Sequence, residues 1–97
     1  MIIKIVESPR ENKRFRAYMN DNKYIDFGLK NGSTYIDHHD KTKRDNYLKR
    51  HMANKREKYL IDNLIESPAL YSAIILWGKY TDIDKNINYL NNLLKNK

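Results

Sequence analysis

The chain is divided by the stretch Ser33-Thr-Tyr-Ile-Asp-His-His-Asp-Lys-Thr-Lys-Arg-Asp-Asn-Tyr-Leu-Lys-Arg-His-Met-Ala-Asn-Lys-Arg-Glu-Lys58. The part before it is rich in predicted strands, and the part after it is predicted to be helical. Asp37 or Asp40 can cap a helix that begins near Lys41, because a carboxylate accepts hydrogen bonds from the free amides of a first helical turn. The apolar pattern changes phase near Asn54. We therefore predict a break there, and two helices in place of one long helix.

Positive charge is concentrated in this stretch. Eight Lys or Arg and three Asp or Glu lie between His38 and Lys58, so this segment carries +5 of the net charge of +7. Such a block is typical of a surface that meets phosphate groups or acidic protein, although a solvated helix without a partner has the same composition. Tyr47 and His51 add rings that can pack on sugars or bases. The candidate binding residues are Arg14, Arg16, Lys43, Arg44, Tyr47, Arg50, His51, Lys55, Arg56 and Lys58.

Before this stretch the sequence has the pattern of a small antiparallel sheet. Residues 2–6 are mostly β-branched, and Lys13–Met19 and Lys23–Phe27 alternate apolar and polar side chains around a turn rich in Asn and Asp. We predict a hairpin or a three-stranded meander whose outer face carries Arg14 and Arg16. Thr34–Ile36 either adds a short strand or packs over the edge of the sheet.

Two neighbouring stripes run along the basic segment when residues are placed on a helix. We expect the first stripe to pack against the protein; its residues are Leu48, Met52 and Tyr59. The second stripe is expected to face outward; its residues are Arg44, His51, Lys55 and Lys58.

The remaining residues predict two further helices. Ser67-Pro68 favours a helix start, because serine caps the first turn and proline loses no hydrogen bond there. We expect this helix to end at Gly78. Its residues 70–77 are so apolar that they belong in the core or in a homodimer contact, and Trp77 is more often a core residue than a partner anchor. Thr81–Asp84 resembles a capping box for the last helix, whose apolar face is formed by Ile83, Ile87, Leu90 and Leu94.

Together these patterns predict an α+β fold with three to four helices. The chain is expected to form a single domain over residues 1–97, β-rich over 1–36 and helical over 40–97. The absence of cysteine excludes disulfides and thiolate metal sites and is compatible with the cytosol or nucleus. The longest apolar run, Ala73–Trp77, is too short to cross a membrane, and the first residues lack a signal-peptide pattern.

The chemistry-bearing residues do not predict an enzyme. His38, His39, Asp40 and His51 are metal-ligand types, but adjacent histidines point to opposite sides and no His-x-x-x-His pair is present. The sequence also lacks a glycine-rich phosphate loop, a nucleophile elbow and a spaced carboxylate pair. We expect no catalytic residues, no metal and no cofactor.

Several motifs are similar to those of a known group of proteins. They are Lys13-Arg-Phe15, Tyr24-Ile-Asp-Phe-Gly28, Ser33–Asp40, Tyr47-Leu-Lys-Arg-His51 with Arg44, and Ser72–Lys79. In combination, over about residues 10 to 90, they resemble a small uncharacterised family encoded by large nucleocytoplasmic DNA viruses of the algal-virus and mimivirus kind. The resemblance implies a viral protein, found in the virion, the host cytoplasm or the viral factory.

We therefore expect a non-enzymatic binding protein of a large DNA virus. The leading hypothesis is a virion-associated or minor capsid component whose basic helix contacts nucleic acid or an acidic protein surface, with no membrane partner. The alternative is a dedicated DNA- or RNA-binding regulatory protein, for which steep salt dependence of binding would be diagnostic.

Overall fold

An antiparallel sheet forms the amino-terminal part of the computed structural model, which describes all residues from Met1 to Lys97. The strands are β1 (Ile2–Glu7), β2 (Lys13–Met19) and β3 (Tyr24–Leu29), and the sheet order is β1-β2-β3. Both strand pairs are antiparallel. The predicted meander and the α+β class are confirmed.

The two faces of the sheet differ as the alternation predicts. Ala17, Met19 and Phe27 are buried on the face that meets the helices. The turn between β2 and β3 contains Asn22, whose φ of 65° lies in the left-handed region that asparagine tolerates better than most residues. A register shift between Ile2 and Lys4 marks an irregularity where β1 begins.

The segment after the sheet forms a short helix, so of the two alternatives for Thr34–Ile36 the short strand is excluded. This helix is α1 (Tyr35–His38), with Thr34 as its N-cap. Asp37 accepts hydrogen bonds from the Thr34 backbone N–H and hydroxyl, both at 2.9 Å. The Thr-x-x-Asp spacing is a capping pattern, and here it outweighs the β-branched side chains that favoured a strand.

The basic stretch forms two helices separated by a break, as predicted. Asp40 caps α2 (Lys41–Met52), with its side chain accepting hydrogen bonds from the amides of Thr42 and Lys43. Asn54 then caps α3 (Lys55–Asp62) in the same way. A side chain that caps a new helix also ends the previous one, because its own backbone is extended.

Ser67 begins the next helix, as predicted. Its hydroxyl accepts a hydrogen bond from Leu70 N–H, and α4 (Pro68–Tyr71) continues into a π-helical segment, η1 (Ser72–Leu76). The helix ends two residues before the predicted Gly78. Gly78 is nevertheless required there, because a Cβ atom would lie 1.8 Å from the Ile74 carbonyl oxygen.

The last helix, α5 (Ile83–Lys95), begins one residue later than a Thr81 cap would place it. Asp82 is the N-cap, and it accepts hydrogen bonds from the amides of Asp84 and Lys85. The predicted apolar face is confirmed, since Leu90 is fully buried and its neighbours on that face pack against the core; these are Ile83, Ile87 and Leu94.

Asn86 joins the π-helical segment to α5. Its side-chain Nδ2 donates to the carbonyl oxygens of Ile75 and Tyr80, both at 2.8 Å, and its Oδ1 accepts from Tyr80 N–H at 2.9 Å. Ile75 and Tyr80 are five residues apart, the spacing of a π-helical hydrogen bond. The fully buried amide of Asn86 therefore stands between two backbone groups that would otherwise pair with each other.

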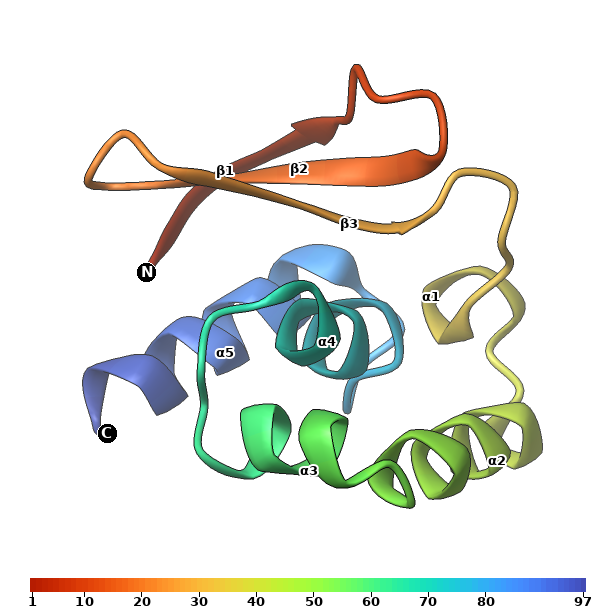
Figure 1. Ribbon diagram of the computed structural model, residues 1–97. Coiled ribbons are helices and arrows are strands. Elements are labelled where there is room, and N and C mark those ends of the chain that lie inside the picture. The colour runs from red at the N-terminus through yellow and green to blue at the C-terminus, as the bar shows by residue number, and fades with distance from the viewer.

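The molecule has a sheet on one side and helices on the other (Figure 1). α4, η1 and α5 lie directly below the sheet, and α2 and α3 form a second tier farther from it (Figure 1). Both layers share one core, in which the Phe27 ring meets the edge of Tyr71 at a centroid distance of 5.5 Å.

The apolar residues 70–77 mostly belong to this core. Leu70, Tyr71 and Ile75 have no exposed surface, and Ala73 and Leu76 have almost none. This segment therefore presents little apolar surface to a second copy, and the homodimer contact stays a prediction. None of the helices is long and apolar enough to span a bilayer.

The free edge of β1 is bonded to α5 at its first residue, Ile2. Asn91 donates from Nδ2 to the Ile2 carbonyl oxygen at 2.9 Å and accepts from Ile2 N–H at 3.0 Å. An edge strand with unpaired backbone groups is a template for association with other chains. The two hydrogen bonds from Asn91 occupy these groups at the first residue of the strand.

Candidate functional site: a basic groove beside the second tier of helices

Two neighbouring depressions lie where the end of β3 and the following loop face α2, α3 and α4. The larger has a volume of about 900 Å³ and the smaller about 270 Å³. Both are lined by Ser33, Tyr47, Arg50 and Trp77, so they are parts of one concave surface. We call this surface the basic groove.

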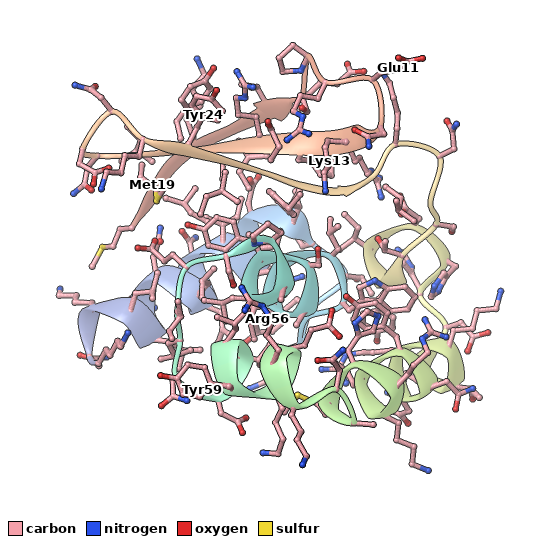
Figure 2. All side chains as sticks on the ribbon, in the orientation of Figure 1. Glu11, Lys13, Met19, Tyr24, Arg56 and Tyr59 are labelled. Carbon is pink, nitrogen blue, oxygen red and sulfur yellow. The ribbon has the colours of Figure 1, made fainter.

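Four cationic side chains from three elements line the basic groove. Lys13 comes from β2, Lys43 and Arg50 from α2, and Arg56 from α3. None of the four forms an ion pair or a side-chain hydrogen bond. In Figure 2, Lys13 extends from the sheet toward the helices, and Arg56 extends from α3 toward α4.

The groove holds no free carboxylate that could neutralise these cations. Glu57 is the acidic residue that lines it, and its Oε2 lies 2.9 Å from Nδ1 of His51. This contact connects α2 to α3 across the break at Asn54. The charges of Lys13, Lys43, Arg50 and Arg56 are therefore left for solvent or for a ligand.

The two exposed sides of α2 differ in charge. At 100° per residue, Lys43, Asn46 and Arg50 fall on one side of the helix, and the first and last of these are exposed cations in the groove. On the other side, Asp45 falls between Lys41 and Lys49. The groove side of α2 thus has the higher density of positive charge.

Three rings stack along the wall of the groove. The ring of Tyr47 lies 4.2 Å from Trp77, at an angle of 5°, and 4.0 Å from His51, at 33°. The two neighbours must cover opposite faces of Tyr47, because one face has room for only one ring at these distances. Burial, and secondarily the charge of Glu57, raises the pKa of Tyr47 to about 12.

The stacking of Tyr47, Trp77 and His51 determines which of the three rings a ligand can contact. Tyr47 has both faces covered, so the expected packing of a sugar or base on its ring is wrong for this residue. Trp77 has Tyr47 on one face and lies 5.3 Å from the His38 ring. His51 is the last ring of the column, its side chain is 27% exposed, and it lines the larger depression.

The predicted outward stripe on α2 and α3 is only half correct. Lys55 and Lys58 are exposed, but Arg44 and His51 are half-buried. The Nε of Arg44 donates to the carbonyl oxygens of Trp77 at 3.0 Å and Gly78 at 2.8 Å. Arg44 therefore caps the end of η1, which has free carbonyl groups, and it is a structural residue.

The predicted packing stripe is also wrong in one position. Leu48 and Met52 are half-buried, whereas Tyr59 is 59% exposed. The break at Asn54 resets the helical phase, so Tyr59 no longer continues the stripe of α2. In Figure 2, Tyr59 lies at the side of α3 that is remote from the sheet.

Arg14 and Arg16 are paired with carboxylates outside the groove. Arg14 donates from Nη1 and Nη2 to the two oxygens of Asp37, both at 2.7 Å, which holds the pKa of that carboxyl far below its usual range. Arg16 binds Asp26 at 2.8 Å and 3.1 Å, which likewise lowers the pKa of Asp26. These arginines connect the sheet to α1 and β2 to β3.

The ten predicted binding residues therefore separate into groups. Tyr47, Arg50, His51 and Arg56 line the larger depression, and Lys43 lines the smaller one with Tyr47 and Arg50. Lys55 is exposed outside the groove, and Lys58 is paired with Asp62 in the next turn of α3. The residues that bind other parts of the protein are Arg14, Arg16 and Arg44.

The adjacent histidines are used locally. Nδ1 of His38 accepts a hydrogen bond from Asp40 N–H at 2.9 Å, and its Nε2 is buried against neighbouring rings without a hydrogen-bond partner. Nε2 of His39 lies 3.2 Å from the Ile36 carbonyl oxygen. The structure contains no group of three or more His, Cys, Asp or Glu placed to hold a metal ion.

Sequence reasoning missed Lys13 and Trp77 as groove residues. Lys13 is the first residue of β2. The alternation of apolar and polar residues in a strand does not indicate which helix the Lys13 side chain will face. Trp77 was expected in the core, and it does pack on Tyr47, but it also lines both depressions. Their placement depends on contacts between segments far apart in the sequence.

Residues 3–51, just over half of the chain, match the Family of unknown function (DUF5754). The chain belongs to this family. The part that matches DUF5754 contains almost all of the sheet and of α2, and so it includes Lys13, Lys43 and Arg50 of the basic groove. Arg56 and Trp77 lie beyond it. No curated protein and no solved structure gives a significant match to this DUF5754 chain.

Proposed function

We propose that this protein is a non-enzymatic binding protein that holds nucleic acid in the basic groove. One observation carries the proposal: Lys13, Lys43, Arg50 and Arg56 converge on a concave surface and have no acidic partner. Like charges held together repel one another, and phosphates of a bound strand would relieve this repulsion and release counterions.

The groove lacks the arrangement that nucleophilic catalysis requires. His51 is oriented by Glu57, as a general base is oriented in many enzymes, but it makes no hydrogen bond to a hydroxyl group. Glu57 is the carboxylate of the groove and is occupied by this contact. These observations favour binding over bond making.

Salt dependence tests the proposal. The affinity for a fluorescently labelled oligonucleotide is measured by anisotropy at several salt concentrations, for the native protein and for the double variant Arg50→Ala/Arg56→Ala. We expect affinity to fall steeply with salt, and the variant to bind at least about tenfold more weakly with a shallower salt slope, by about one unit for each lost phosphate contact.

The matched control removes two positive charges from another helix. Lys85 and Lys95 lie exposed on α5, away from the groove. We expect Lys85→Ala/Lys95→Ala to bind nearly as well as the native protein. Undetectable binding of every nucleic acid at low salt would exclude the proposal, and binding of polyglutamate in its place would identify an acidic protein partner.

The setting that we propose for this binding is a virus particle of a large DNA virus. It is supported by the motif resemblance alone, since DUF5754 carries no assigned function. Quantitative proteomics of purified particles tests it. Many copies per particle would indicate a virion component, whereas a chain present in infected cells and absent from particles would indicate a DNA- or RNA-binding regulator.

A further inference from the structure

We infer that the basic groove selects single-stranded over double-stranded nucleic acid, with one base stacked on the open face of His51. The inference rests on the proposed function, because it names the form of the ligand at the same site. It is carried by the shape of the groove, the position of the free cations and the ring column that ends at His51.

The cations lie inside a concavity and not on a protruding helix. A recess of about 900 Å³ is in the size range of sites for small organic ligands, which is enough for a nucleotide or two. A duplex is instead read by an element that protrudes into its major groove. The concave surface thus suits a flexible strand that can bend into it.

The convex side of the same helices is less suited to a duplex. Asp45 lies between Lys41 and Lys49 on the outer side of α2, and Asp62 pairs with Lys58 on α3. These carboxylates lower the positive potential where a rigid duplex would make contact. The groove side carries no unpaired carboxylate, so phosphates are drawn to it.

His51 is a fixed platform for a base. One face of its ring packs on Tyr47, and Nδ1 is held by Glu57 at 2.9 Å, so the ring cannot turn freely. Proteins that bind single strands combine cationic tracks with aromatic rings on which bases stack. Arg50 and Arg56 line the same depression as His51, so free cations share the groove with the platform.

The decisive experiment compares a single strand with a duplex. An oligothymidylate of roughly eight nucleotides, a span typical of one small domain, and a duplex of equal length are titrated against the protein. Trp77 is the single tryptophan and lines both depressions, so its fluorescence reports occupation of the groove. We expect the single strand to bind at least about tenfold more tightly, the effect of one stacked base, and to change Trp77 emission.

Two pairs of variants locate the site. Lys43→Ala/Arg50→Ala and Lys41→Ala/Lys49→Ala each remove two positive charges from α2, but from opposite sides of the helix. We expect the first pair to weaken single-strand binding at least about tenfold, as expected for lost phosphate contacts, and the second to weaken it far less. Equal weakening by both would show that diffuse charge attracts the strand, and it would overturn the inference.

The platform is tested separately. His51→Ala should abolish most of the preference for the single strand, whereas His51→Phe, which keeps a flat ring, should retain it; circular dichroism verifies that both variants fold. Equal affinity for both ligands, with Trp77 emission changing on binding, overturns this inference while leaving the proposed function standing. Binding without a change in Trp77 emission would place the ligand outside the basic groove and would remove both. Failure to bind any nucleic acid removes both.

Discussion

At the scale of single residues, paired arginines and free arginines have different roles in this protein. Arg14, Arg16 and Arg44 each bind protein oxygens and hold segments together, whereas Arg50 and Arg56 have no partner. A guanidinium group suits both tasks, because its planar donors match a carboxylate, two carbonyl oxygens or a phosphate. The amino-acid composition does not distinguish the paired arginines from the free ones. Only the contacts of each side chain show which role it has.

The pair of Arg14 and Asp37 predicts how stability depends on pH. The pKa of Asp37 is lower in the folded protein than its ordinary value of 3.8. A carboxyl group of this kind contributes stability that is complete above the unfolded pKa and is lost as the pH falls toward the folded pKa. We expect the free energy of unfolding to decrease below a pH of about 4, and to decrease less in Asp37→Asn.

Urea denaturation at a series of pH values measures this dependence. Asp45→Asn is the matched control, because Asp45 is exposed and has no ion-pair partner. Asp26 is held by Arg16 in the same manner, so some pH dependence remains in Asp37→Asn. If Asp37→Asn and Asp45→Asn gave identical profiles, the contribution of the Arg14 pair would be negligible.

At the scale of elements, the junction between η1 and α5 depends on one inserted amide. Asn86 satisfies the Ile75 carbonyl and both backbone groups of Tyr80. Asn86→Leu keeps the approximate volume and removes these hydrogen bonds. Because an unpaired backbone group costs about 1 to 3 kcal/mol when buried, we expect a loss of about 2 to 4 kcal/mol in the free energy of unfolding.

The same substitution at an exposed position of α5 is the control for this prediction. Asn88 is exposed on that helix, and we expect Asn88→Leu to change stability by no more than about 0.5 kcal/mol. Both variants are measured by urea denaturation with the native protein. Equal stability of Asn86→Leu and the native protein would mean that water replaces the amide at this junction.

Much of the element pattern was predictable from sequence because its causes are local. The hairpin, the cap at Asp40, the break at Asn54 and the start at Ser67 each depend on a few adjacent residues. The short helix α1 was not predicted, although its Thr-x-x-Asp cap is also local; a strand and packing over the sheet edge were the alternatives for Thr34–Ile36. Where two local sequence patterns predict different structures for one segment, the packing of the folded protein determines which structure forms.

At the scale of the whole molecule, the site was less predictable than the fold. Arg44 faces inward because it meets carbonyls more than thirty residues away, and Tyr47 is covered because Trp77 stacks on it. Lys13 enters the groove because the sheet lies across the helices. The charge of the basic stretch indicated where binding residues are concentrated, but their division into free and occupied groups follows from long-range contacts.

The shared core predicts cooperative unfolding of the whole chain. Strands and helices contribute to one cluster, in which Phe27 of β3 packs on Tyr71 of α4. We expect Trp77 fluorescence and far-UV circular dichroism to report the same urea midpoint, since a small single domain usually unfolds in one step. Two separated midpoints would show instead that residues 1–36 and 40–97 are independently stable units.

The contact between Asn91 and Ile2 also affects how the chain folds during synthesis. The ribosome releases β1 long before α5, the helix that carries Asn91. At about 5 to 20 residues per second, the strand emerges several seconds ahead of that helix. During this interval the backbone groups of Ile2 have no partner from α5, and this edge of β1 is a template for pairing with neighbouring chains on the same messenger RNA until α5 has emerged.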